Sequence, residues 1–100
     1  MTVTAKKDGT KLTIAAEGKL GTTSAPELEK ALKENISGVT ELVFDFGKLE
    51  YMASAGLRVL LSAGKVMKKQ GSMKIINVMK PVMDVFTFTG MADVFDIEMA

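Results

Sequence analysis

The chain switches repeatedly between two hydrophobic spacings, and this alternation constrains its fold more than any other feature. Residues 2–6 and 11–16 alternate between apolar and polar side chains, which is typical of strands, and the turn-forming pair Asp8-Gly9 lies between them. Together they predict an opening β-hairpin. Beyond it, helical and strand spacings alternate, giving the order β-β-α-β-α-β-α-β. Because strands joined through helices run parallel, we predict a single α/β domain over residues 1–100, with an N-terminal β-hairpin, a mixed, mainly parallel sheet and helices packed against it.

Start and stop signals set the bounds of the predicted helices. The first helix is expected to begin at Ser24, where Ser24 and Glu27 can form a capping box, and to end at Ser37-Gly38. The second is expected to follow Met52 and to end at Gly71, and the third runs from Pro81 to Gly90. The predicted inward-facing positions of the last two helices are Leu57, Leu60, Leu61, Gly64, Met67, Val82, Val85, Phe86 and Phe88.

Three further segments have strand character. Residues 41–46 form a short apolar run whose length suits a strand buried on both faces, with a connection over residues 47–52. Residues 74–78 predict another strand, and residues 94–99 a last strand at the edge of the sheet. Met67, Met73 and Met79 fall where core residues are expected, so core filling explains most of the eight methionines better than an adaptable binding surface does.

Composition excludes several classes of chemistry. The 100 residues contain no cysteine and no histidine, so this chain holds no disulfide, no thiolate nucleophile and no Ser-His-Asp or Cys-His catalytic group. The spacing of its Asp and Glu residues points to no metal site, and residues 18–23 lack the spacing of a phosphate-binding loop. We therefore expect no metal and no cofactor.

Charge and hydropathy also limit the expected partners and location. The formal net charge is +1, which favours neither nucleic acid nor an anionic membrane as partner. The start of the chain lacks the apolar core of a signal peptide, and no run approaches the ~20 apolar residues of a membrane span. We expect a cytoplasmic protein without membrane insertion.

One segment, residues 49–61, carries the strongest functional signal. Ser54 lies where the N-cap of the second helix is expected, followed by Ala55 and by Gly56 in the first turn. Glycine is unfavourable there, so it needs a reason. One reason is close approach by another molecule, since a helix N-terminus receives an anion well and a phosphate on Ser54 would meet its free amides. The other is that Ser54 is simply a cap and Gly56 allows tight packing of the helix on the sheet. The residues alone leave both open.

The segment Tyr51–Leu61 resembles the signature of the STAS domain family, the fold of bacterial anti-sigma factor antagonists. Weaker similarities occur in the family's order along nearly the whole chain: Gly18-Lys19-Leu20 with residues 22–28, then Val43–Phe46, then Gly90–Phe95, with Met91 where the family has Leu.

The resemblance implies a regulatory binding protein and not an enzyme. In such a partner switch, the unphosphorylated antagonist binds an anti-sigma factor that is also a serine kinase, which frees the sigma factor for transcription. Phosphorylation of the antagonist ends the binding, and a serine phosphatase reverses it. The phosphorylated serine matches Ser54. The implied partner-binding residues are Gly21, Thr22, Thr23, Met52, Ala53, Ser54, Ala55, Gly56 and Arg58.

Two positions depart from the family pattern. Ala53 stands where the family often has Asp before the serine, and Gly21 where it often has Asp after the second strand. These departures motivate an alternative: a non-switching interaction subunit of the same fold, for example of a lipid-transport ATPase complex or a multi-component signalling assembly.

Two further alternatives draw on single features. An enzyme with Ser54 as nucleophile needs a lysine base beside it, and the nearest in sequence is Lys48. Nucleic-acid binding would use the basic face of Lys65, Lys68 and Lys69, but aromatic residues are sparse there, so no direct nucleic-acid partner is expected.

Overall fold

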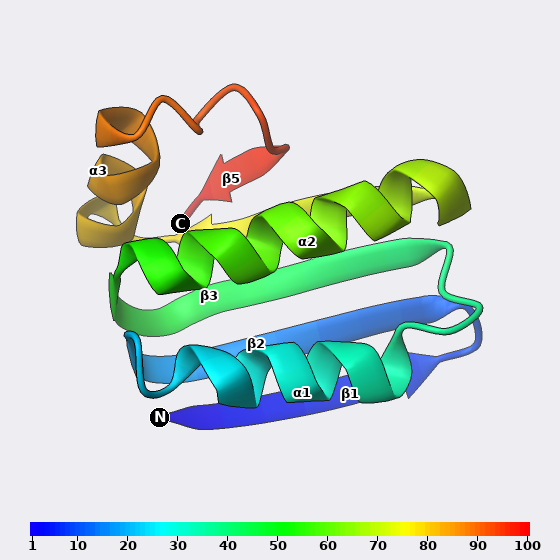
Figure 1. Ribbon diagram of the computed structural model, residues 1–100. Helices are drawn as coiled ribbons and strands as arrows, with labels where there is room; N and C mark the ends of the chain where they lie inside the picture. Colours follow the sequence, from blue (N-terminus) through cyan, green and yellow to red (C-terminus); the bar gives the residue numbers. More distant parts are fainter.

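The computed structural model describes residues 1–100 as five strands and three helices, in the predicted order (Figure 1). The strands are β1 (Thr2–Asp8), β2 (Lys11–Leu20), β3 (Glu41–Met52), β4 (Ser72–Val78) and β5 (Ile97–Met99), and the helices are α1 (Ala25–Asn35), α2 (Ser54–Gln70) and α3 (Lys80–Phe88). They form one sheet in the order β1-β2-β3-β4-β5. β1 is antiparallel to β2, and the other neighbours are parallel. The predicted α/β fold is confirmed.

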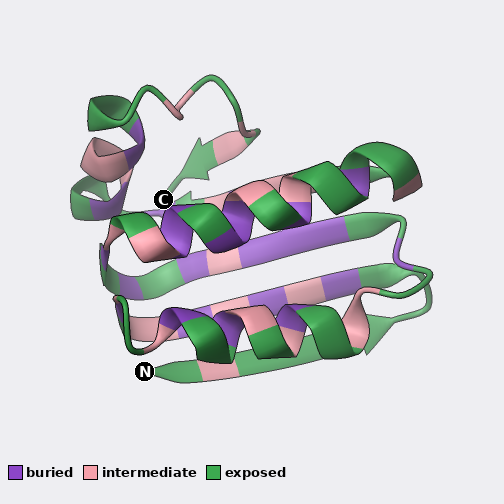
Figure 2. Ribbon diagram, viewed as in Figure 1, coloured by how far each residue is buried: buried purple, intermediate pink, exposed green.

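The helices cover one face of the sheet. Because the strands follow one another in sequence order, right-handed crossovers place all connecting helices on the same side. In Figure 1, α1 and α2 lie side by side along the strands, while α3 lies beyond the start of α2. Figure 2 shows that their buried stripes face the sheet. A single cluster of 22 buried residues fills this layer, including Ile14 of β2, Phe44 of β3 and Leu60 of α2.

Strand β3 is longer than predicted. It continues through residues 47–52, expected to be a connection, and pairs with the end of β2 at Lys19–Tyr51 and Leu20–Met52. The pairing shifts register twice, each time with one extra residue in β3, and the buried side chains of Leu49 and Met52 hold the extension against the core. The extension carries the chain to the start of α2 at the same sheet edge as the end of β2.

The prediction of which residues of α2 face the core was only partly right. Leu57, Leu60 and Met67 are buried as predicted, but Leu61 and Gly64 are only half-buried, whereas Val59 and Ala63 are buried. The buried stripe of α2 is thus turned toward the neighbouring helix α1.

The prediction was also wrong in part near the C-terminus. Val82 and Phe86 form the inward stripe of α3, with Val85 half-buried, but Phe88 is 91% exposed because two residues turn a helix by about 200°. Met79 is exposed as well, and β5 begins at Ile97 and not at Val94.

Candidate functional site

The two sequence segments predicted to bind a partner come together at one edge of the sheet. Residues 21–23 follow β2, and residues 52–58 join β3 to α2, so both lie at the carboxyl ends of neighbouring parallel strands. The Ala53 amide donates a hydrogen bond to the Leu20 carbonyl at 2.8 Å, which ties the two segments together. In open α/β sheets, ligands bind outside the carboxyl ends of the strands.

Helix α2 begins one residue earlier than predicted, because the N-cap was expected at Ser54. Ala53 is its N-cap, with extended backbone, and Ser54 is its first helical residue. Ser54 is exposed, and its hydroxyl makes no capping hydrogen bond. The Ala53 carbonyl accepts from the amides of Gly56 (2.9 Å) and Leu57 (3.4 Å), whereas the amides of Ser54 and Ala55 have no backbone acceptor. The helix thus presents an unengaged hydroxyl beside two free donors and the positive end of its dipole.

Packing inside the protein accounts for Gly56. A Cβ at this position would lie 2.7 Å from Leu20 Cδ2 and 2.9 Å from Met52 Cγ, closer than side chains tolerate. Of the two explanations for this glycine, the structure supports the tight contact between helix and sheet. The glycine therefore lets the start of α2 sit directly on the ends of β2 and β3.

The start of α1 differs from its prediction. Ser24 is the N-cap but forms no capping box with Glu27. Its hydroxyl instead accepts a hydrogen bond from the Gly21 amide at 2.8 Å and donates one to the Lys19 carbonyl at 2.9 Å. Because these bonds close the loop after β2, they fix residues 21–23 beside the start of α2.

The candidate partner-binding residues differ in exposure. Thr22, Thr23, Ser54 and Arg58 are exposed, Gly21, Ala53 and Ala55 are half-buried, and Met52 and Gly56 are buried. The last two shape this surface from beneath. We call the exposed and half-buried members together the Ser54 surface.

Arg58 is the cation of the Ser54 surface. It lies four residues after Ser54, one helical turn along, and forms no ion pair with any of the chain's carboxylates, all of whose pairs involve lysine. With Thr22 and Glu29 it lines a cavity of about 230 Å³ between the first turns of α1 and α2. No lysine is hydrogen-bonded to Ser54, and no three acidic side chains come together as a metal-binding group.

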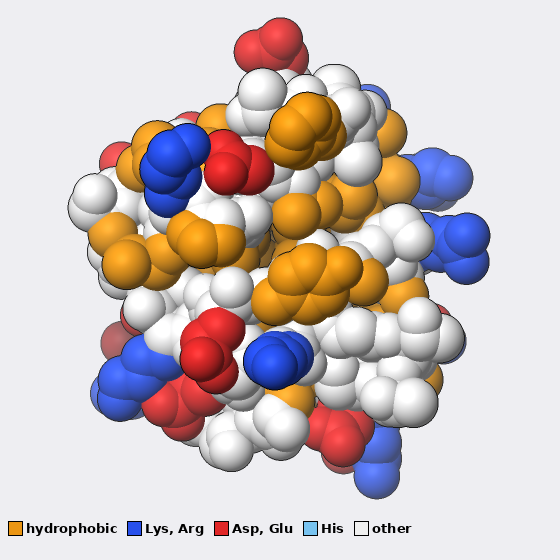
Figure 3. All heavy atoms as spheres, turned by 90° about the vertical axis from the view of Figure 1, so that its left-hand side faces the viewer, with side chains coloured by type: hydrophobic (Ala, Val, Ile, Leu, Met, Phe, Trp, Pro, Cys, Tyr) orange, Lys and Arg blue, Asp and Glu red, His pale blue; other side chains and the backbone are white.

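Exposed apolar side chains that were not predicted from the sequence also lie near this edge. Tyr51, at the end of β3, is 51% exposed, and Met79 follows β4. Figure 3 looks onto this side of the molecule and shows hydrophobic side chains gathered across it, with acidic and basic groups at their margins. Strand periodicity alone could not have identified Tyr51, because strict alternation places it on the same face as the buried Leu49. The register shift between the pairs Gly18–Leu49 and Lys19–Tyr51 changes the alternation, so that Met52 is buried and Tyr51 is exposed.

Comparison with known proteins identifies the family. The STAS domain model matches residues 2–100. The chain belongs to the STAS domain family. It is 30% identical to BtrV of Bordetella bronchiseptica over 99 residues, covering 97% of this chain and 85% of the relative. It is also 30% identical to the anti-sigma-B factor antagonist of Bacillus subtilis over 96 residues, covering 95% and 88%.

Solved structures share the fold of this STAS domain. An anti-sigma factor antagonist from Mycobacterium paratuberculosis matches with a TM-score of 0.87 at 19% identity, over 97% of this chain and 84% of the other. The Bacillus protein SpoIIAA in its phosphorylated form matches with a TM-score of 0.75 at 18% identity, over 96% and 90%. In this STAS domain, no helix is long and apolar enough to cross a membrane.

Proposed function

We propose that the protein is an anti-sigma factor antagonist and that phosphorylation of Ser54 switches it off. The observation that carries the proposal is the exposed Ser54 hydroxyl, free of hydrogen bonds at the start of α2, beside the loop after β2. The name of the Bacillus subtilis relative and the phosphorylated form of SpoIIAA support both parts of the proposal. The proposed partner is an anti-sigma factor with serine kinase activity. A serine phosphatase is proposed to remove the phosphate from Ser54 and restore binding.

Binding and switching use the same surface. The unphosphorylated protein docks the Ser54 surface on the anti-sigma factor, with Tyr51 as an aromatic anchor at its margin. The kinase then transfers the γ-phosphoryl group of ATP to the Ser54 oxygen: the bond between the γ-phosphorus and the bridging oxygen breaks, ADP leaves, and the hydroxyl proton passes to a base of the kinase or to solvent. The product carries about two negative charges at pH 7. Desolvating that charge in a packed interface is costly, so the complex dissociates.

The protein acts here as a binding partner and substrate of the kinase, without catalytic residues of its own. The two free amides and Arg58 stabilise the added phosphate on the helix, so that phosphorylation changes the surface without unfolding α2. The proposed location is the cytoplasm, where such a kinase, its ATP and its sigma factor meet.

Binding constants for Ser54 variants test the proposal. With the cognate anti-sigma kinase, isothermal titration should give similar affinity for wild type and Ser54→Ala and at least tenfold weaker binding for Ser54→Asp. ATP should release the wild-type complex but not the Ser54→Ala complex. Equal binding of all three proteins, before and after ATP, would refute the switch.

A second candidate function is a non-switching interaction subunit of the same fold. Ala53 and Gly21 favour it, because both place uncharged residues on the Ser54 surface where the family often has Asp. Affinity purification from native cells separates the two: recovery of transporter ATPase subunits, with Ser54 unmodified, supports the second function, and recovery of an anti-sigma kinase supports the first.

A further inference from the structure

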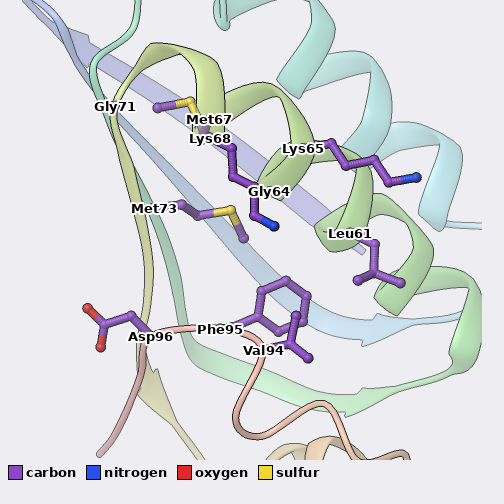
Figure 4. Close-up of a pocket in the computed structure, with 10 residues that line it drawn as sticks. All are labelled: Leu61, Gly64, Lys65, Met67, Lys68, Gly71, Met73, Val94, Phe95 and Asp96. Atoms are coloured by element: carbon purple, nitrogen blue, oxygen red, sulfur yellow. The ribbon is translucent and has the colours of Figure 1, made fainter.

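A second surface feature lies at the other end of α2. A cavity of about 300 Å³ opens between the C-terminal half of α2, the start of β4 and residues 94–96 before β5 (Figure 4). Its size is at the lower end of the roughly 300–1,000 Å³ of small-molecule sites. Lys68, which lines it, is 14 residues from Ser54, about 21 Å along the helix. The cavity is therefore separate from the Ser54 surface.

The lining of the cavity is largely apolar. Its five hydrophobic residues are Leu61, Met67, Met73, Val94 and Phe95. Gly64 lines the cavity on the helix side, and a Cβ there would lie in ordinary contact with Phe95 Cε1, at 3.8 Å, so a longer side chain at this position would enter the cavity. In Figure 4 the Phe95 ring and the Met73 side chain border the same space.

Residues 94–96, which form one wall of the cavity, are held in place by contacts with α3 and β4. The Phe95 ring packs edge-on against Phe86 of α3, with ring centroids 5.9 Å apart and planes at 71°. The Ile75 amide donates to the Asp96 carbonyl at 2.9 Å, which fixes the backbone of the loop on β4. The cavity is thus largely formed before a ligand enters, which lowers the cost of binding.

The charge that faces the cavity is positive. In Figure 4, the Lys68 side chain points into the space between Met73 and Phe95, whereas the side chains of Lys65 and Asp96 point away from it. Lys68 forms no ion pair, since the chain's pairs engage only lysines 11, 33, 48, 74 and 80. An anionic group at the mouth would therefore find an uncompensated ammonium, next to an apolar interior.

We propose that this cavity binds a small amphipathic carboxylate, with its alkyl tail against Met73 and Phe95 and its carboxylate accepting hydrogen bonds from Lys68 Nζ. A single ammonium with no cluster of backbone amides suits a monoanion better than a phosphate. The apolar lining requires a tail of several carbons. The site does not depend on modification of Ser54, so its test and that of the proposed function fail independently.

Titration of the ¹⁵N-labelled protein with straight-chain carboxylates tests the site. Octanoate should shift the amide signals of Leu61, Gly64, Met73 and Phe95 with saturation. Affinity should rise about three- to fourfold for each added CH₂ from butanoate until the cavity is full. Octanamide, which keeps the tail and lacks the charge, should bind about three- to fivefold more weakly.

Three variants locate the ligand. Lys68→Gln should weaken octanoate about three- to fivefold, whereas Lys69→Gln, its exposed neighbour that does not line the cavity, should leave binding unchanged. Gly64→Leu places a side chain in the cavity and should abolish the shifts, with the spectrum reporting that the protein is folded. Absence of saturable shifts in wild type, or shifts retained in folded Gly64→Leu, overturns the proposal.

Discussion

The starts of α1 and α2 are neighbours at one edge of the sheet, and each carries a serine. The two serines differ in whether their hydroxyl groups make hydrogen bonds within the protein. The Ser24 hydroxyl is fully engaged, between the Gly21 amide and the Lys19 carbonyl. The Ser54 hydroxyl is exposed and takes no part in capping α2. A hydroxyl that holds no local structure can be modified or replaced without disturbing the fold, and this difference favours Ser54 over Ser24 as the site of regulation.

The largest expected effect separates the two serines as kinase substrates. Incubation with the cognate anti-sigma kinase and ATP should phosphorylate wild type and Ser24→Ala to the same extent, and Ser54→Ala not at all. The physical reason is access, because only Ser54 offers a free hydroxyl at the exposed end of a helix. Intact-mass and peptide mass spectrometry measure the incorporation. A phosphate on Ser54→Ala, or its loss in Ser24→Ala, would contradict the assignment.

The next effect concerns the close contact beneath the Ser54 surface. Gly56→Ala should lower the free energy of unfolding by about 1–3 kcal/mol, because its Cβ overlaps Leu20 and Met52. Gly64→Ala is the matched control on the same helix: its Cβ meets only Phe95 at 3.8 Å, so the better helix propensity of alanine should raise stability by up to about 1 kcal/mol. Urea denaturation measures both, and equal effects would show that Gly56 is not required for packing.

The two serines should also differ in how much their hydroxyl groups contribute to the stability of the fold. Ser24→Ala should cost about 1–2 kcal/mol, because it leaves the Gly21 amide and the Lys19 carbonyl without their partner. Ser54→Ala should change stability by less than about 0.5 kcal/mol, as expected for an exposed side chain without contacts. Thermal unfolding of the two variants under one condition measures the difference. A comparable loss for Ser54→Ala would mean that its hydroxyl has a structural partner after all.

The sequence predicted the element order and the start of α2 from local signals, whereas the inclusion of residues 21–23 in the Ser54 surface came from the family resemblance. Hydrophobic spacing marks strands and helices, and Ser54-Ala55-Gly56 marks the start of α2. The capping box at Ser24 was wrong because its hydroxyl found partners in the preceding loop, which spacing within the helix does not reveal. The extension of β3 depends on pairing with β2 and on burial of Leu49 and Met52. The exposure of Phe88 and the cavity beside Gly64 likewise follow from how distant segments pack.

The smallest expected effect tests whether Arg58 supports the modified helix. In the phosphorylated protein, Arg58→Gln should lower stability by about 0.5 kcal/mol, or about 2–4 °C in the unfolding midpoint, because a cation one turn after Ser54 can pair with the phosphate. In the unphosphorylated protein the same substitution should change little, since Arg58 has no ion pair to lose. Lys69→Gln, at the far end of α2, controls for the loss of one positive charge. If Arg58→Gln has the same effect with and without the phosphate, the free amides of Ser54 and Ala55 alone stabilise the added charge, and Arg58 remains available to the partner protein.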